Sequence, residues 1–214
     1  MTTPAPRNWL EWHHPYDDPT SPLSRRLRTV QRFLREAIDA RPGPIRLISM
    51  CAGQGRDVIP VLAEHLRRDD VAALLVELDP RNADAARAAA RLAGLGRVTV
   101  LGDDAALTDN YTSAVPADIV LACGIFGNIS DADIENTVRH LPQLCAEGAT
   151  VLWTRGRRPD NDITPQIRRW FEDSGFEELA FEAPAGTHYS VGAHRLIIPP
   201  PRLQPGLKLF TFVR

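Results

Sequence analysis

IRLISMCAGQGRD, residues 45–57, combines an apolar run with two glycines that a single residue separates. Ile45–Met50 has the length and composition of a buried strand. Gly53 and Gly55 permit a tight turn that a ligand can approach closely. A helix expected after the turn would present unpaired N–H groups at its N-terminus. Because many strand-to-helix turns use glycine for geometry alone, the surrounding pattern decides what this loop means.

On both sides of this loop, short apolar runs typical of strands alternate with segments whose apolar residues recur at helical spacing. Strands that alternate with helices predict a mostly parallel sheet covered on both faces. Residues 182–206 contain five prolines and no helical period, so we expect a long loop that joins two antiparallel final strands. Besides 45–50, strands are expected at 72–77, 98–101, 119–122, 150–154, 176–181 and 207–213, and helices at 22–40, 56–67, 80–94, 130–140 and 164–175.

Length and composition indicate one globular domain. The chain has 214 residues, of which 43% are hydrophobic and 24% charged. We expect a single domain over 1–214, with an N-terminal lid segment and helix in 1–41 and a Rossmann-like core in 45–214. The basic residues are 24 Arg and one Lys, but the net charge is only -2. This argues against general nucleic-acid binding, and codon bias is the simplest explanation of the Arg excess.

Several other classes are excluded by what the sequence lacks. No apolar run approaches the ~18–20 residues of a membrane span, and residues 1–12 contain no secretory apolar segment. Cys51, Cys123 and Cys145 form neither a disulfide framework nor a zinc motif. We therefore expect a cytoplasmic, soluble protein without a membrane partner or a metal. Its oligomeric state stays open.

Acidic residues follow the second and third expected strands. Glu77 ends the second strand, where an acid in a nucleotide-binding sheet accepts hydrogen bonds from ribose hydroxyls. Asp79 is placed to cap the next helix. Asp103 and Asp104 follow the third strand, where a carboxylate can accept a hydrogen bond from an adenine amino group. Gly-Asp-Asp is also good turn chemistry, and for Asp103 both interpretations stand.

In order and spacing, these motifs resemble the class I S-adenosylmethionine-dependent methyltransferase family. The resemblance covers roughly residues 21–212, with residues 118–128 similar to the family's fourth strand and the loop after it. It implies a three-layer sandwich whose seven-stranded sheet has its last strand inserted antiparallel between the fifth and the sixth. The residues then expected to bind S-adenosylmethionine are Tyr16, Ser49, Cys51, Ala52, Gly53, Gly55, Asp57, Glu77, Leu78, Asp103, Asp104, Ala105, Cys123 and Gly124.

Two positions depart from the family's pattern. Ser49 stands where the family usually has an acid, and Cys51 where it usually has glycine. Cysteine restricts the positive-φ geometry that glycine permits. As a hypothesis, Asp57, Asp17 or Asp18 replaces the missing carboxylate.

Three segments are candidates for the mouth of the site. In the N-terminal segment, Tyr16 is the best candidate for a cofactor contact, while Trp9 and Trp12 can equally anchor the tail. His13 and His14 are candidate bases, although adjacent histidines in a polar tail are usually solvated. The other candidates are Arg155, Arg157 and Arg158 after the fifth strand, although such a run is more often a solvated loop. In the late loop they are His188, Tyr189 and His194, where a core or loop histidine is the default interpretation.

The function that we expect is methylation of a small molecule by in-line transfer, with the catalytic residues unknown. Residues 123–128, Cys-Gly-Ile-Phe-Gly-Asn, lack the Asp/Asn-Pro-Pro-aromatic motif typical of amide and exocyclic-amine methylation. One alternative is an NAD(P)-dependent oxidoreductase, but Val58 occupies the place of the third glycine and a single Lys leaves no Tyr-x-x-x-Lys dyad. Another is a non-catalytic protein that binds S-adenosylmethionine.

Overall fold

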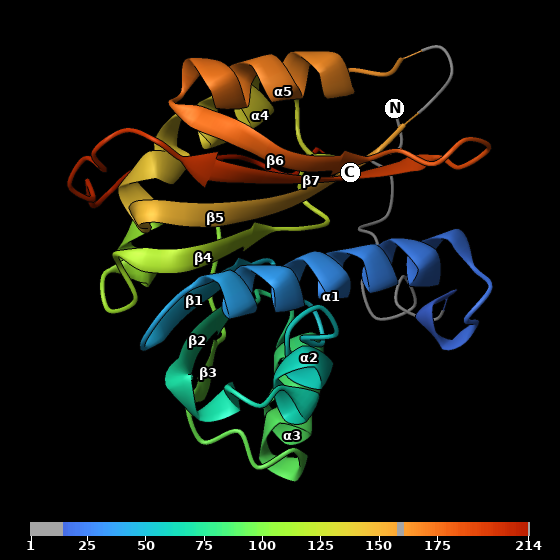
Figure 1. Ribbon diagram of the computed structural model, residues 1–214, viewed down its shortest axis with the longest axis vertical. Coiled ribbons are helices and arrows are strands. Elements are labelled where there is room, and N and C mark those ends of the chain that lie inside the picture. Colours follow the sequence, from blue (N-terminus) through green and yellow to red (C-terminus); the bar gives the residue numbers. More distant parts are fainter. Residues whose placement is uncertain (1–14, 158–160, 214) are drawn as a thin grey trace, which may run out of the picture.

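The computed structural model describes residues 15–157 and 161–213, which form one sheet with helices on both faces (Figure 1). The strands are β1 (Ile45–Met50), β2 (Val71–Val76), β3 (Val98–Leu101), β4 (Ala117–Ala122), β5 (Cys145–Gly156), β6 (Phe176–Glu182) and β7 (Tyr189–Leu196). The helices are α1 (Pro22–Ala40), α2 (Ile59–Glu64), α3 (Pro80–Leu92), α4 (Asp131–His140) and α5 (Thr164–Asp173), with short 3-10 turns at Arg68–Asp70, Thr108–Tyr111 and Leu141–Leu144.

The strand order is β3-β2-β1-β4-β5-β7-β6. Strand β7 runs antiparallel to both of its neighbours, and the other neighbouring strands are parallel. This confirms the predicted three-layer, Rossmann-like architecture. The chain leaves β1 toward β2 and β4 on opposite sides, so a crevice opens beyond the carboxyl ends of β1 and β4.

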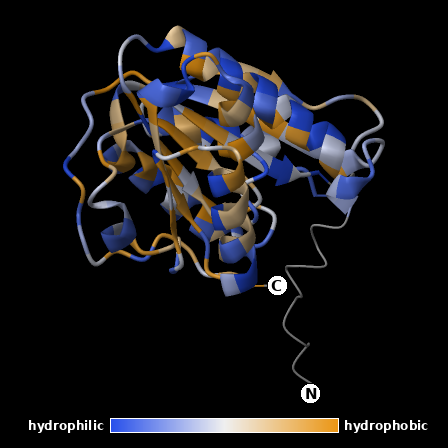
Figure 2. Cartoon of the chain, turned by 90° about the horizontal axis from the view of Figure 1, so that it is seen from below, coloured by the Kyte–Doolittle hydropathy of each residue, from blue (hydrophilic) through white to orange (hydrophobic). Residues whose placement is uncertain are grey.

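Two apolar layers hold the sheet between its helices. On one face, Val30, Leu34 and Ile38 of α1 pack with residues of α2 and α3 against the sheet. On the other face, Ile134 of α4 and Phe171 of α5 belong to a second buried cluster. Figure 2 shows the hydrophobic residues gathered along the strands and the hydrophilic ones on the outer helix surfaces. Burial on both faces explains why the central strands β2 and β4 are nearly continuous apolar runs.

Helix α1 begins and ends where the sequence predicts. The Ser21 hydroxyl accepts a hydrogen bond from the Ser24 N–H (3.0 Å), and Pro22 occupies the first turn, where its missing N–H costs nothing. The helix packs against β5 and β7. Its apolar stripe is therefore buried, and the N-terminal end of α1 lies beside the crevice.

The prediction of the last strand at 207–213 is wrong. The strand is β7, inside the segment predicted to be a loop. Its sequence, YSVGAHRL, contains small residues because Trp153 of β5 occupies the neighbouring space. A Cβ added to Gly192 would lie 2.6 Å from Trp153 Cζ2 and still closer to Cε2 and Nε1. Strand β7 is buried, but its small residues do not form the apolar run by which a buried strand is recognised in a sequence.

The segment 207–213 instead crosses the loops that follow β3 and β4. It forms isolated bridges from Lys208 to Leu107 and from Phe212 to Ile129. The Leu209 N–H donates to the Ala106 carbonyl (2.8 Å). The C-terminal segment therefore reaches the carboxyl edge of the sheet.

Other boundaries differ by a few residues. Helix α2 begins at Ile59 rather than at 56, because the glycine loop continues through Val58 before the first helical turn. Strand β5 extends from Cys145 to Gly156, well beyond the predicted 150–154. Among the described residues, no helix has both the length and the apolar character needed to cross a membrane.

Candidate cofactor site

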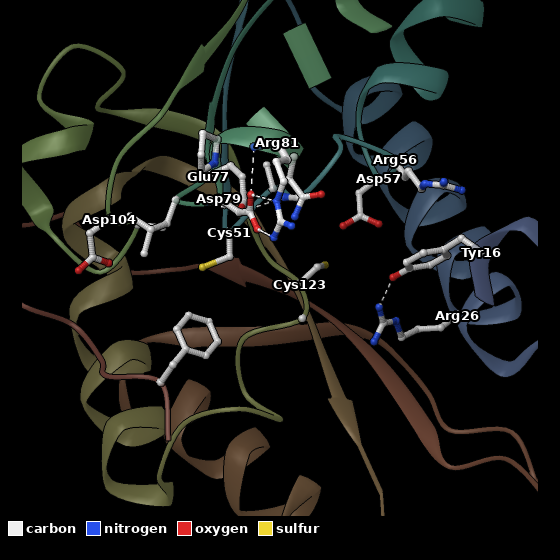
Figure 3. Close-up of a pocket in the computed structure, with 18 residues that line it drawn as sticks. Tyr16, Arg26, Cys51, Arg56, Asp57, Glu77, Asp79, Arg81, Asp104 and Cys123 are labelled. Carbon is white, nitrogen blue, oxygen red and sulfur yellow. Dashed lines mark hydrogen bonds and ion pairs between the residues drawn. The ribbon is translucent and has the colours of Figure 1, made fainter. Parts of the chain in front are cut away.

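A cavity of about 440 Å³ lies beyond the carboxyl ends of the central strands (Figure 3). This volume is within the ~300–1,000 Å³ of typical small-molecule sites. The loops after β1, β2, β3 and β4 line it, together with α1 and two segments distant in sequence. Its residues are Tyr16, Arg26, Cys51, Ala52, Gly53, Arg56, Asp57, Glu77, Leu78, Asp79, Pro80, Arg81, Asn82, Asp104, Ala105, Cys123, Gly124 and Phe212.

The glycine loop has a left-handed backbone at three positions. The φ angles are +56° at Gly53, +73° at Gly55 and +50° at Cys51. A side chain at Gly55 would lie 3.2 Å from Leu75 Cδ2 and closer to Ile59, so that glycine is also needed for packing. Among the described residues, Cys51 is the one non-glycine residue with a positive φ. The loop thus stores backbone strain beside the cavity.

Glu77 links this loop to the end of β2. Its Oε2 accepts a hydrogen bond from the Gly53 N–H (2.8 Å), and its Oε1 accepts one from the Asp79 N–H (2.9 Å). The residue is only 9% exposed, and burial raises the pKa of its carboxyl group, while the two backbone donors oppose that shift. Each carboxylate oxygen has a second lone pair, so Glu77 can still accept hydrogen bonds from a ligand.

Asp79 and Asp104 have structural partners at the same edge. Asp79 caps α3 by accepting from the Arg81 N–H (3.0 Å), and it pairs with the Arg81 guanidinium (2.7 Å), which lowers the pKa of Asp79. Asp104 Oδ1 accepts from the Ala106 N–H (2.9 Å), and its Oδ2 lies 3.8 Å from Lys208 Nζ. The chain's single lysine therefore reaches the cavity edge from the C-terminal segment.

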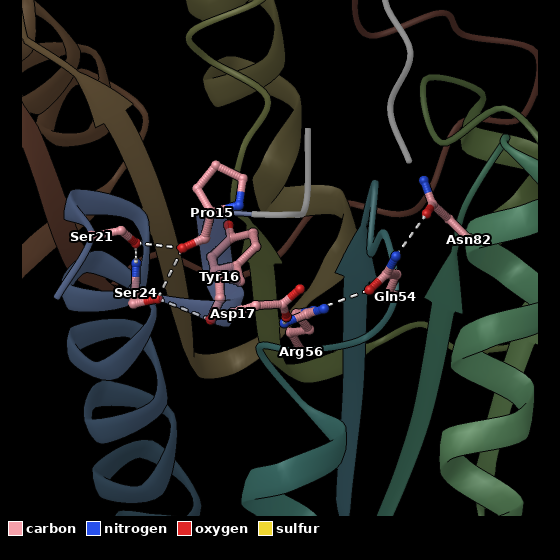
Figure 4. Close-up of polar contacts among 8 residues, drawn as sticks. All are labelled: Pro15, Tyr16, Asp17, Ser21, Ser24, Gln54, Arg56 and Asn82. Atoms are coloured by element: carbon pink, nitrogen blue, oxygen red, sulfur yellow. Dashed lines mark hydrogen bonds and ion pairs between the residues drawn. The ribbon is translucent and has the colours of Figure 1, made fainter. Parts of the chain in front are cut away.

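The N-terminal segment is fastened over the cavity (Figure 4). Ser24 Oγ donates to the Tyr16 carbonyl (3.1 Å), and Arg56 pairs with Asp17 (3.0 Å). The Arg56 guanidinium lies 5.5 Å from the centre of the Tyr16 ring. The Tyr16 hydroxyl accepts a hydrogen bond from Arg26 Nη2, and burial raises the pKa of Tyr16 to about 12. Tyr16 is therefore a neutral phenol held by two arginines.

Two cysteines face the middle of the cavity. Burial raises the pKa of the Cys51 and Cys123 thiols well above the usual range. Both are therefore neutral at physiological pH and poor nucleophiles. The loop behind Cys123 is fixed by a hydrogen bond from the Gly124 N–H to Thr154 Oγ1 (2.9 Å).

The structure brings most of the predicted cofactor residues to one cavity. Three do not line it: Ser49 is buried in β1, Gly55 shapes the loop beneath, and Asp103 is exposed and accepts from the Asp104 N–H. Sequence reasoning missed several lining residues, and only the helical spacing on α1 could have pointed to the first of them. They are Arg26, Arg56, Asp79, Pro80, Arg81, Asn82 and Phe212.

Arg155 and Arg157, two candidates for binding a ligand, do not line this cavity. Arg157 donates to the carbonyls of Ala183, Pro184 and Thr187 (3.2–3.4 Å) and thereby fixes the loop before β7. Arg155 is also absent from the lining, and Arg158 lies outside the described residues. Arg26 of α1 and Arg81 of α3 do line the cavity, and Arg81 is at the same time exposed to solvent. A sequence pattern does not show which helix end packs beside a cavity. It therefore could not distinguish the arginines that line the cavity from those that support a loop.

The remaining candidates lie elsewhere. His194 is buried in the core, where Nδ1 accepts from the Trp153 indole N–H (3.1 Å), and burial lowers its pKa to about 4. Tyr189 is buried with the α1 side of the sheet, and His188 is exposed. The Asn128 amide donates to the Gly124 carbonyl (2.8 Å) and thereby holds the turn after β4. Trp9, Trp12, His13 and His14 lie outside the described residues.

Comparison with models of known protein families gave no match, and no curated protein sequence matched the chain. Solved structures do share its fold. One is magnesium protoporphyrin IX methyltransferase from Synechocystis PCC 6803 with bound S-adenosylhomocysteine, at 11% identity and a TM-score of 0.68, covering 88% of this chain and 93% of the other. Another is 1,6-didemethyltoxoflavin-N1-methyltransferase from Burkholderia thailandensis, at 14% identity and a TM-score of 0.66, covering 89% and 84%.

A third similar structure is described as a possible exported protein from Bordetella parapertussis. It is 17% identical, with a TM-score of 0.63, and the match covers 81% of this chain and 68% of the other. The chain therefore has the fold of class I methyltransferases, as its sequence motifs predict.

Proposed function

We propose that this chain is an S-adenosylmethionine-dependent methyltransferase that acts on a small molecule. The observation that carries the proposal is the Glu77 carboxylate. It is buried at the end of β2, bound to the backbone of the glycine loop, and it lines the cavity. A carboxylate placed this way favours a ligand with adjacent hydroxyl groups. The methyltransferases with the same fold support the choice of cofactor.

The lining offers partners to each part of an adenosine group. Glu77 accepts from the ribose hydroxyls. Asp104 accepts from the adenine amino group, and Leu78, 66% exposed at the mouth, offers an apolar surface to the base. The cofactor supplies a methyl group on a positively charged sulfur. The chain's contribution is to position that group and exclude water, which in-line displacement requires.

A small-molecule acceptor is supported by the names of the similar enzymes and by the absence of an overall basic charge. The acceptor reaches the cavity between Tyr16 of the N-terminal segment and the loop after β4, where Cys123 and Gly124 line it. A general base is needed only if the attacking atom must lose a proton. On sequence grounds we propose the cytoplasm as the compartment.

Calorimetry with S-adenosylhomocysteine and with NADP tests the cofactor. We expect S-adenosylhomocysteine to bind and NADP not to bind, and binding of NADP alone would overturn the proposal. Glu77→Gln should weaken S-adenosylhomocysteine binding by about 10-fold or more, because hydrogen bonds to charged groups are the strong ones. Glu147→Gln, on an exposed residue, is the matched control and should bind like the parent.

Turnover distinguishes an enzyme from a binding protein. The parent protein is incubated with cofactor labelled on its methyl group and with a panel of phenols, carboxylic acids, heterocyclic amines and activated carbons. Transfer of label to one class, lost in Glu77→Gln, supports the proposal. Tight binding without transfer to any member would favour a non-catalytic binding protein.

A further inference from the structure

Opposite charges meet at one end of the cavity. In Figure 3, Tyr16, Arg26 and Asp57 lie together on the side away from Asp104, with Cys51 and Cys123 between the two ends. The Asp57 carboxylate and the Arg26 guanidinium both face the same space. The Asp104 end, by contrast, offers hydrogen-bond acceptors to a nucleoside.

The positions of these groups are fixed by the fold. Arg26 is on the first turns of α1, which Ser21 caps. Tyr16 is held by Ser24 and stacked under Arg56, so its hydroxyl stays on the Arg26 guanidinium. Such pre-organisation lowers the entropic cost of binding a charged ligand.

Asp57 is half-buried and lacks the hydrogen-bond donors that a carboxylate withdrawn from bulk water normally has. Within residues 15–157 and 161–213, no group donates a hydrogen bond to it, and its favourable charge partner is Arg26. Burial raises the pKa of Asp57, and Arg26 opposes the shift. A carboxylate kept in such a place costs stability, which indicates that a cationic ligand group compensates for it.

The two ends together describe a ligand with a nucleoside at one end and a zwitterion at the other. We propose that Arg26 and the Tyr16 hydroxyl bind the α-carboxylate of the cofactor and that Asp57 binds its α-ammonium group. This assignment rests on the proposed function and deepens it. It also accounts for Ser49, because the missing acid at the end of β1 is replaced by Asp57 from the glycine loop that precedes α2.

The other two acids considered for this role are engaged elsewhere. Asp17 pairs with Arg56, and its side chain is 68% exposed. Asp18 accepts from the N–H and the hydroxyl of Thr20 (2.8 Å each), and these hydrogen bonds lower its pKa. Neither lines the cavity.

The test compares three ligands by calorimetry. S-adenosylhomocysteine has both charged groups, its decarboxylated analogue keeps only the ammonium, and methylthioadenosine has neither. For S-adenosylhomocysteine, Arg26→Ala and Asp57→Asn should each weaken binding by about 10- to 100-fold. Arg26→Ala should leave the decarboxylated analogue within about threefold of the parent. Neither variant should change methylthioadenosine binding by more than that.

Controls and a milder variant keep the result interpretable. Arg25→Ala and Asp69→Asn alter exposed residues of the same type that do not line the cavity, and these variants should bind all three ligands like the parent. Arg26→Lys keeps the charge but loses the forked geometry, so its loss should be intermediate. It replaces Arg26→Ala if thermal unfolding shows that the alanine variant does not fold.

The outcomes separate the two proposals. Failure of S-adenosylhomocysteine to bind the parent protein would overturn the proposed function. Normal binding of all ligands by Arg26→Ala and Asp57→Asn, or equal losses for S-adenosylhomocysteine and methylthioadenosine, would overturn the amino-acid site alone. Asp57→Asn with unchanged affinity and lost turnover would make Asp57 a base instead of an ammonium ligand.

Discussion

Replacing Gly192 with alanine tests whether β7 lies directly under the Trp153 indole. The new Cβ would be 2.6 Å from Cζ2 and closer to two further indole atoms. The backbone cannot move aside easily, because Gly192 pairs with Trp153 on one side and with Phe181 on the other. The indole cannot move easily either, since it is fully buried, stacked on Phe171 at 5.8 Å and hydrogen-bonded to His194.

The cost can be worked from these contacts. Forcing an extra methyl group into a packed core costs about 1–3 kcal/mol. Displacing the indole weakens its hydrogen bond to His194, which adds about 1 kcal/mol. We therefore expect Gly192→Ala to lower the free energy of unfolding by about 2–4 kcal/mol. For a domain of this size, that lowers Tm by about 10 °C.

The assay is urea unfolding followed by circular dichroism, with two comparisons. Gly96→Ala makes the same change where a Cβ would meet nothing within 4 Å, and it should alter stability by less than about 0.5 kcal/mol. In a Trp153→Leu background, Gly192→Ala should cost little, because the clashing atoms are gone. If Gly192→Ala were equally costly in both backgrounds, or cost nothing in the parent, the packing argument would be refuted.

Three further predictions concern the cavity and the core. Cys51→Gly should be more stable than Cys51→Ala by about 1 kcal/mol in thermal unfolding, because φ is +50° there; equal stability would show that the loop is unstrained. Burial lowers the pKa of His194 to about 4, so its contribution to stability is present above about pH 6.5 and lost as pH falls toward 4. His194→Gln should remove up to about 3 kcal/mol of that pH dependence, and an unchanged slope would contradict this. Burial raises the pKa of Asp57, so its favourable contribution is present only below the pKa of the unfolded chain and lost as pH rises. Asp57→Asn should therefore unfold at a higher temperature than the parent at pH 7 but not below about pH 4, and a less stable variant at pH 7 would contradict the reasoning.

Much of the sheet could be predicted because its signals are local. The apolar runs of β1, β2 and β4 are buried on both faces and need no knowledge of their neighbours to be recognised. Strand β7 has the same environment but a different composition, since Trp153 fills the volume that its side chains would otherwise occupy. Which strand supplies the bulky side chain and which the small ones depends on tertiary packing.

The candidate site divides in the same way. Glu77, Asp104 and the glycine loop occupy strand ends, and the carboxyl ends of neighbouring parallel strands meet at one edge, so their convergence followed from order alone. Phe212 reaches the cavity through bridges to distant loops, which no spacing along the chain indicates.

The arginines show which features of this protein the sequence determines and which depend on the tertiary structure. By itself the sequence determined the alternating sheet, the glycine loop and the acids that follow β2 and β3, because each depends on residues adjacent along the chain. Only the tertiary structure decided which charges act together. Arg157 supports a loop, whereas Arg26 meets Asp57 and Tyr16, because the packing of α1 against β5 and β7 brings the start of that helix to the cavity.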